Sequence, residues 1–156
     1  WIDRKTVQTV EARPQAIGTE VQPYTLANGV DDALRLSPDY LIVGEVRDGQ
    51  AAMALFRAMM TGHSGACTFH ADHPQEAVER MATILGTDQR IERESALQMI
   101  GSSVDLLVQI GIRQEVRRVT SISTLIAGRV GEALHFRHLY RFADDVQAGM
   151  PAWEKC

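Results

Sequence analysis

The sequence predicts an α/β fold: a mostly parallel sheet flanked by helices, followed by antiparallel strands toward the C-terminus. Strand-like and helix-like segments alternate over the first two thirds of the chain, and this alternation calls for parallel pairing through right-handed crossovers. An unbroken apolar run, YLIVGEV at 40–46, is typical of a strand buried on both faces of such a sheet. The last third changes to period-two patterns around the turn-like AGRVGE, which predicts antiparallel strands within about 104–142.

Local signals set the expected elements. Val and Thr dominate KTVQTVE, which predicts a strand. Pro38 disfavours helix in the residue before it, whereas Pro74 suits a first helical turn and Gly86 a C-terminal cap. The expected elements are, in order, strand 5–11, helix 25–36, strand 40–46, helix 50–60, strand 66–70, helix 74–86, helix 92–103 and strand 104–110. Leu134, Phe136, His138, Tyr140 and Phe142 are expected on one face of a final strand.

Composition excludes several classes of function. The chain has 156 residues, enough for one domain, with 45% apolar and 23% charged residues. Its net charge of −4 argues against direct nucleic-acid binding and against electrostatic membrane binding, so any membrane association must come through a partner. The two cysteines suggest no disulfide framework, which favours a cytoplasmic location, at most peripheral at the inner face of the cell membrane.

The segment PDYLIVGEVRD, 38–48, carries the sharpest chemical signal. A buried strand here delivers Glu45 at its carboxyl end, and open α/β sheets bind ligands beyond the carboxyl ends of their strands. A carboxylate at that place can hold the hydration shell of Mg²⁺ or orient water toward a γ-phosphate, which is the logic of a Walker B element. The alternative is a surface ion pair between Glu45 and Arg47. Both readings remain open on this segment alone.

The segment TGHSGACTFHADH, 61–73, clusters three histidines and a cysteine. His70 ends the second predicted strand, on the same edge as Glu45, and an imidazole there can donate a hydrogen bond to a phosphate or its attacking water. Zinc is the rival, since H-x₃-C-x₂-H-x₂-H has suitable ligands. However, Cys67 and His70 lie three apart on a strand and so face opposite ways. Cys67 is instead expected as a small buried hydrophobe, with His73 or the preceding aspartate capping the next helix.

The stretch ALRLSPDYLIVGEVRDGQAAMALFRAMMTGHSGACTFHADHPQEAVERM resembles the Walker B and histidine-box region of the type II/IV secretion ATPases. That superfamily powers type II secretion, type IV pili, tight-adherence pili and conjugative transfer. The matching pieces are LR..PD at 34–39, GEVRD at 44–48, TGH at 61–63 and TFHAD at 68–72. The layout looks most like the tight-adherence and conjugation branch. The resemblance covers roughly 5–142 and implies that residues 1–156 are the C-terminal part of a RecA-like motor domain.

The resemblance also implies roles for particular residues. Glu45 matches the Walker B glutamate that supports hydrolysis, with no direct metal ligand expected beyond the Mg²⁺ shell. His63 and His70 match the two histidines placed near the γ-phosphate. The other matched positions are Glu11, as the first acid of the aspartate box, and Arg35, Arg47 and Asp48, as nucleotide or subunit contacts.

Two departures from the family pattern stand out. The aspartate box is usually Glu-Asp-x-x-Glu, but EARPQ at 11–15 lacks both later acids, so Glu11 acts alone or this branch hydrolyses ATP differently or poorly. The chain also contains no G-x-x-x-x-G-K-[ST], the Walker A loop that holds phosphates and that the family carries upstream. Losing three charge-assisted hydrogen bonds of about 1.5–3 kcal/mol each weakens binding by about a thousandfold or more. This chain alone is expected to bind ATP feebly and to hydrolyse none.

The resemblance therefore predicts part of a hexameric ATPase that uses ATP and Mg²⁺ and works with an inner-membrane platform protein. Its cargo stays open, because pilin, secreted protein and DNA transfer share this engine. The alternative is a non-catalytic assembly module derived from such an ATPase, which the altered EARPQ segment favours.

Overall fold

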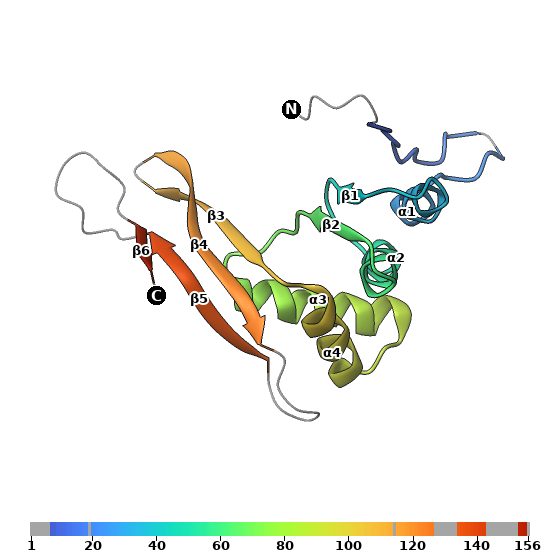
Figure 1. Ribbon diagram of the computed structural model, residues 1–156. Helices are drawn as coiled ribbons and strands as arrows, with labels where there is room; N and C mark the ends of the chain where they lie inside the picture. Colours follow the sequence, from blue (N-terminus) through green and yellow to red (C-terminus); the bar gives the residue numbers. More distant parts are fainter. Residues whose placement is uncertain (1–6, 19, 114, 127–133, 143–152, 156) are drawn as a thin grey trace. The chain divides into compact units, whose positions relative to one another are not determined.

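The computed structural model describes residues 7–18, 20–113, 115–126, 134–142 and 153–155 (Figure 1). The chain forms two compact units, Trp1–Thr68 and Phe69–Cys156. Among the described residues, no helix is both long and apolar enough to cross a bilayer.

The first unit contains the predicted parallel crossover. Its elements are α1 (Leu26–Leu34), β1 (Tyr40–Val43), α2 (Gly49–Met60) and β2 (Ser64–Cys67). The two strands pair in parallel, with Tyr40 opposite Ser64 and Val43 opposite Cys67, and α2 connects them (Figure 1). The predictions of helices near 25–36 and 50–60 and of a parallel pair are thus confirmed, although both strands end earlier than expected.

Local hydrogen bonds explain where the two helices begin. Thr25 and Asn28 form a capping box at α1, each side chain bonding the other's backbone N–H. The Asp48 carboxylate accepts the Ala51 N–H at 2.8 Å and caps α2. These bonds satisfy N–H groups that have no partner inside a helix.

The expectation that β1 is buried on both faces is wrong. Leu41 and Val43 are buried, together with Leu55 and other apolar residues of α1 and α2. Tyr40 and Ile42 point the other way and are 73% and 61% exposed. Helices of this unit cover one face of the pair, and within the described part of the chain nothing buries the other.

The predicted strand 5–11 is also wrong for its described part. Residues 7–11 belong to no strand, and Val7 and Val10 are 56% and 42% exposed. Strand propensity needs a hydrogen-bonding neighbour, and the described parallel sheet has only β1 and β2. A bridge joins Arg13 to Tyr24 by two backbone hydrogen bonds of 2.8 and 2.9 Å.

The second unit joins two helices to an antiparallel sheet. Its elements are α3 (Pro74–Gln89), α4 (Arg93–Ser103), β3 (Leu107–Arg113), β4 (Val116–Ile126), β5 (His135–Phe142) and β6 (Trp153–Lys155). The strands follow one another in sheet order, and every pair is antiparallel (Figure 1). The predicted change to antiparallel strands is confirmed; AGRVGE lies outside the described residues.

A bulge overturns the predicted alternation of the last strand. His138 lies opposite Ser123, but Tyr140 lies opposite Ile122, so Leu139 is an extra residue in the register. One extra residue moves the following side chains to the other face. Phe136 and His138 therefore share a face that Tyr140 does not.

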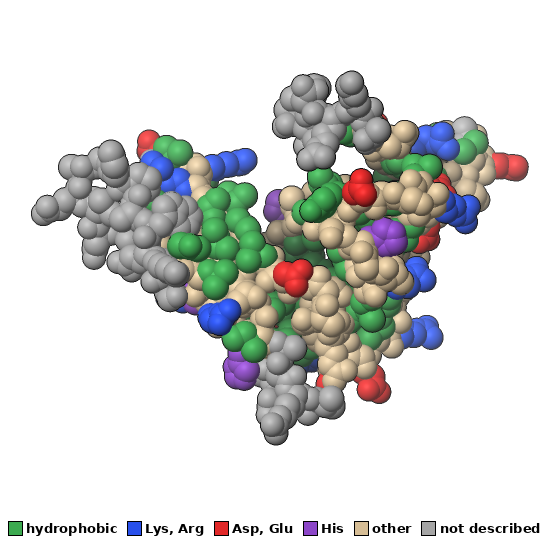
Figure 2. Space-filling model, viewed as in Figure 1, with side chains coloured by type: hydrophobic (Ala, Val, Ile, Leu, Met, Phe, Trp, Pro, Cys, Tyr) green, Lys and Arg blue, Asp and Glu red, His purple; other side chains and the backbone are tan. Residues whose placement is uncertain are grey.

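Apolar side chains also remain on the surface of this sheet. Val108, Ile110 and Ile112 alternate along β3 and are 49%, 62% and 64% exposed. Figure 2 shows hydrophobic side chains gathered on the surface of this sheet. The helices instead bury Val78, Met81, Leu85 and Ile100.

Candidate functional site

Glu45 lies just beyond the carboxyl end of β1. The Val46 N–H donates to the Thr68 carbonyl oxygen at 3.0 Å, and the Thr68 hydroxyl donates to the Gly44 carbonyl oxygen. The parallel pairing of β1 with β2 thus continues past both strand ends, and Thr68 is bonded to the residues on either side of Glu45. The expectation that the predicted strands 40–46 and 66–70 are parallel neighbours is confirmed for the pairing itself, although the ladder joins 40–43 to 64–67.

Glu45 forms an ion pair with Arg47. The Arg47 Nη2 lies 2.6 Å from Glu45 Oε2. The Arg47 side chain is 77% exposed and the Glu45 side chain 23%. The hydrogen bond with Glu45, and then its negative charge, raise the pKa of Arg47. This ion pair is the one predicted from the sequence as the alternative interpretation of Glu45. Exposed pairs stabilise folded proteins little, so this contact does not commit the carboxylate to a purely structural role.

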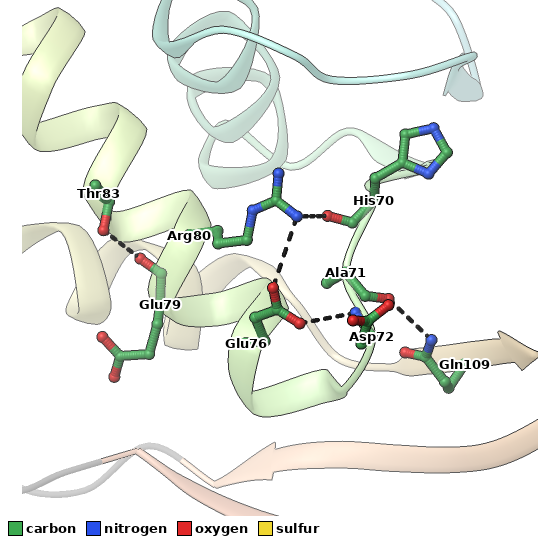
Figure 3. Close-up of polar contacts among 8 residues, drawn as sticks. All are labelled: His70, Ala71, Asp72, Glu76, Glu79, Arg80, Thr83 and Gln109. Atoms are coloured by element: carbon green, nitrogen blue, oxygen red, sulfur yellow. Dashed lines mark hydrogen bonds and ion pairs between the residues drawn. The ribbon is translucent and has the colours of Figure 1, made fainter.

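His70 follows β2 but is not part of it, because the strand ends at Cys67 instead of reaching residue 70. Beyond the strand, side chains bind the main-chain carbonyl groups. Arg80 Nη1 donates to the His70 carbonyl oxygen at 2.7 Å, and Gln109 Nε2 donates to the Ala71 carbonyl oxygen at 3.1 Å. The Glu76 carboxylate accepts the Asp72 N–H at 2.8 Å. Figure 3 shows the His70 ring directed away from these three side chains.

His63 lies at the other end of the parallel pair from Glu45. It precedes Ser64, the first residue of β2, whereas Glu45 follows the last residue of β1. The four-residue strand between these ends is roughly 13 Å long. The His63 Nδ1 instead lies 3.3 Å from the Ala58 carbonyl oxygen, at the end of α2. The structure therefore does not bring His63 and Glu45 together, contrary to their expected common place at one phosphate.

The remaining candidate residues are spread over the first unit. Arg35 follows α1 as its C-terminal cap residue and is exposed. The Asp48 carboxylate is occupied by the cap of α2. Glu11 is exposed and lines a shallow depression with Arg13 and Tyr24. The Tyr24 hydroxyl donates to Asp32 at 2.7 Å, and this hydrogen bond raises the Tyr24 pKa.

The zinc alternative gains no support from the geometry. Within the described ranges, no three side chains of His, Cys, Asp or Glu converge as a metal site would require. Cys67 is exposed, which corrects the expectation of a buried hydrophobe, and partial desolvation raises its thiol pKa. A zinc ligand needs the thiolate, so this shift acts against metal binding.

The entry into α3 also differs from expectation. His73 is the N-cap residue but makes no side-chain cap bond, and Pro74 occupies the first turn. Glu76 supplies the polar contact instead, through the Asp72 N–H. Sequence reasoning did not single out Glu76 and Arg80, although their i,i+4 spacing on a helix directly after the histidine box was a usable signal. Gln109 lies 38 residues from Ala71 and offered no signal.

The two histidines of β5, His135 and His138, lie in different surroundings. The His138 Nδ1 lies 2.8 Å from the hydroxyl of Ser123, which is fully buried. Burial, followed by the charge of Arg141, lowers the pKa of His138. His135 is exposed on the same strand.

The fold is similar to part of a solved secretion ATPase. The crystal structure of the VirB11 ATPase from the Brucella suis type IV secretion system superposes with a TM-score of 0.59 over 64% of this chain and 32% of VirB11. The sequence identity is 20%, so this likeness shows the fold alone. The α/β class predicted from the sequence is confirmed.

Residues 5–132 match the family model described as type II/IV secretion system protein, and the chain belongs to that family. It is 37% identical to the conjugal transfer protein TrbB of Rhizobium radiobacter over 99 residues, which are 62% of this chain and 29% of TrbB. It is 36% identical over 129 residues to a putative conjugal transfer protein of Mycobacterium tuberculosis, covering 80% of this chain and 36% of the relative. The type II secretion system protein E of Dickeya dadantii is 37% identical over 76 residues, 46% of this chain and 15% of the relative. The chain thus spans about a third or less of these relatives.

Proposed function

We propose that this chain is part of an ATPase that hydrolyses ATP with Mg²⁺ to power protein secretion, pilus assembly or conjugative transfer. The observation that carries the proposal is Glu45 beyond the carboxyl end of β1, beside a parallel β2 that leads directly to His70. Open α/β sheets bind ligands at this edge. Family membership supplies the class of reaction, since secretion ATPases drive transport by phosphoryl transfer to water.

The residues at this edge fit the chemistry of a magnesium nucleotide. Mg²⁺ retains several waters in such sites and needs only one or two carboxylates besides the phosphates. The carboxylate of Glu45 is partly exposed, so a hydrated ion or an attacking water could reach it. Bound Mg²⁺ would neutralise phosphate charge. Glu45 would orient the water. His70 belongs to the second unit, and for it we propose, from the family pattern alone, a hydrogen bond toward the γ-phosphate.

The assembly and location follow the family and are proposed with the activity. We expect a homo-hexamer in the cytoplasm, peripheral at the inner face of the membrane, bound to an inner-membrane platform protein. The names of the conjugal transfer and type II secretion relatives support a transport machine as the setting. The chain by itself should be inactive, because it contains no phosphate-binding G-x-x-x-x-G-K-[ST].

Substitution of Glu45 by glutamine in the full-length protein tests this function. Glu45→Gln should leave the Kd for ATP within about twofold and lower kcat by a factor of about a hundred or more, because the amide cannot orient water as a carboxylate does. Glu79→Gln is the matched control, since Glu79 is an exposed, ion-paired glutamate on α3. Unchanged turnover in Glu45→Gln would remove Glu45 from the mechanism.

A non-catalytic assembly module is the second candidate. Two observations favour it: the ion pair that occupies Glu45, and the EARPQ segment without its later acids. In that case the full-length protein would show no magnesium-dependent ATP hydrolysis but would still co-assemble with its secretion machine. Measurable hydrolysis that is lost in Glu45→Gln rejects this candidate.

A further inference from the structure

Three consecutive residues of the histidine-box loop are each held through the main chain by a different side chain. Arg80 binds the His70 carbonyl, Gln109 the Ala71 carbonyl, and Glu76 the Asp72 N–H (Figure 3). We call Glu76, Arg80 and Gln109 the loop clamp.

The clamp members are also connected to one another. Arg80 Nη1 lies 3.7 Å from Glu76 Oε1, one helical turn earlier on α3. Its guanidinium also lies over the ring of Phe69, 5.6 Å from the centroid. Arg80 thus contacts the residue before His70 by cation–π stacking and His70 itself by a hydrogen bond. A planar guanidinium can lie over the ring and donate hydrogen bonds from its edge at the same time, a geometry that a compact ammonium group does not reproduce.

We propose that the loop clamp is a positioning device for His70 and that it ties the histidine-box loop to β3. This inference rests on the proposed ATPase function. The clamp holds main-chain atoms and leaves the His70 ring directed away from it (Figure 3). The clamp therefore fixes the backbone from which the His70 ring projects, and the ring extends on the side away from the clamp.

Because these contacts are exposed, we expect them to matter for the position of His70 more than for the stability of the fold. The side chains of Arg80 and Glu76 are 53% and 40% exposed, and exposed ion pairs add little to folding free energy. Losing them should leave the fold intact. However, small displacements of a group that contacts the reacting phosphate can slow chemistry by up to about a hundredfold.

Gln109 connects the loop to a strand, whereas the other two clamp residues lie on α3. It lies on β3, where it pairs with Ser121 of β4, and its own carbonyl oxygen accepts the Thr120 hydroxyl at 3.3 Å. A shift of the loop at Ala71 therefore pulls on a strand that is hydrogen-bonded into the antiparallel sheet. The loop and this sheet should move together.

Paired substitutions in the full-length protein test the clamp. Arg80→Met should lower kcat about ten- to hundredfold while the KM for ATP changes less than about twofold, because the clamp orients His70 without holding nucleotide. Arg93→Met is the control: Arg93 makes a closer pair with Glu79, 2.7 Å to both oxygens, at 66% exposure. It should retain wild-type kcat. Equal losses in both variants, or a raised KM alone, would overturn the proposal.

Conservative rescue provides a second arm. Glu76→Gln keeps an oxygen that can accept the Asp72 N–H, whereas Glu76→Ala does not, so kcat should recover largely in Glu76→Gln relative to Glu76→Ala. A third arm is independent of activity. Hydrogen exchange of the Asp72 amide should be faster in Glu76→Ala and unchanged in Arg93→Met. Unchanged exchange in Glu76→Ala would show that the clamp does not hold the loop.

These arms separate the two hypotheses. If Glu45→Gln abolishes hydrolysis while Arg80→Met and Glu76→Ala match the wild type, the clamp is wrong and the ATPase proposal stands. If the protein hydrolyses no ATP, the exchange measurement shows whether the loop is held, but the clamp then positions nothing for catalysis and the proposal falls with the function.

Discussion

The Val46 N–H donates to the Thr68 carbonyl oxygen at 3.0 Å, which carries the pairing of β1 and β2 past Glu45. The Thr68 hydroxyl also donates to the Gly44 carbonyl oxygen. Thr68 therefore binds the main chain on both sides of Glu45. The register of a parallel pair of only four residues thus decides where this carboxylate lies.

Gly65 is the position on which this register depends. A Cβ there would collide with the Leu41 carbonyl oxygen and lie 2.5 Å from the Met59 methyl group. The methyl group can move, but the carbonyl belongs to the neighbouring strand. Gly65→Ala should therefore destabilise the full-length protein by about 1–3 kcal/mol, measured by urea denaturation, and should lower ATP hydrolysis.

Gly44→Ala is the control for this prediction. It lies next to Glu45, yet a Cβ there meets no atom within 4 Å, and its φ lies outside the left-handed region. Stability in Gly44→Ala should stay within about 0.5 kcal/mol of the wild type. If Gly65→Ala is as stable as Gly44→Ala, the close approach of the two strands at this residue is not real.

The two histidines of the box should behave differently. His70→Ala should lower kcat strongly with little change in thermal stability. His63→Ala should instead lower the midpoint of thermal unfolding while kcat changes less than about threefold, because its imidazole contacts the Ala58 carbonyl at the far end of the strand pair. Differential scanning fluorimetry and steady-state hydrolysis measure both effects. A large kcat loss in His63→Ala at unchanged stability would return His63 to the phosphate site.

Much of the fold was predictable because its signals are local. Asp48 caps α2 and Pro74 opens α3 as their residue types suggest, and the apolar run after Asp39 forms a parallel strand. Errors arose where the outcome depends on partners distant in sequence. Residues 7–11 have strand propensity but lie beside no described strand, and Tyr40 and Ile42 are apolar but uncovered.

The candidate site was predictable in part for the same reason. The parallel direction of the strands followed from the pattern, so the edge carrying Glu45 was expected correctly. The predicted strand 66–70 correctly left His63 before the strand, but it ended on His70, whereas β2 ends at Cys67. Spacing within the histidine box could not show that Gln109 reaches Ala71, because that contact depends on how β3 packs near α3.

The last prediction concerns the pH dependence of stability in the second unit. Burial and the charge of Arg141 lower the pKa of His138 below its ordinary value of 6.5. The unfolded chain therefore binds a proton at His138 more readily than the folded one, so protonation favours unfolding. The contribution of His138 to the free energy of unfolding is fully present above about pH 6.5 and is lost as the pH falls through the pKa of the folded state. In the protonated ring both nitrogens carry hydrogen, so Nδ1 can then only donate to the Ser123 hydroxyl.

His138→Gln removes this titration, and a glutamine amide can still bond the Ser123 hydroxyl. Urea denaturation of the wild type and His138→Gln at pH 8, 7, 6 and 5 should give a stability difference that is constant above pH 7 and shifts in favour of the variant below pH 6.5. His135→Gln is the matched control, because it makes the same substitution at an exposed position of the same strand. A parallel pH dependence in all three proteins would mean that His138 titrates alike in the folded and unfolded chain, and that its desolvation beside Ser123 has no energetic consequence.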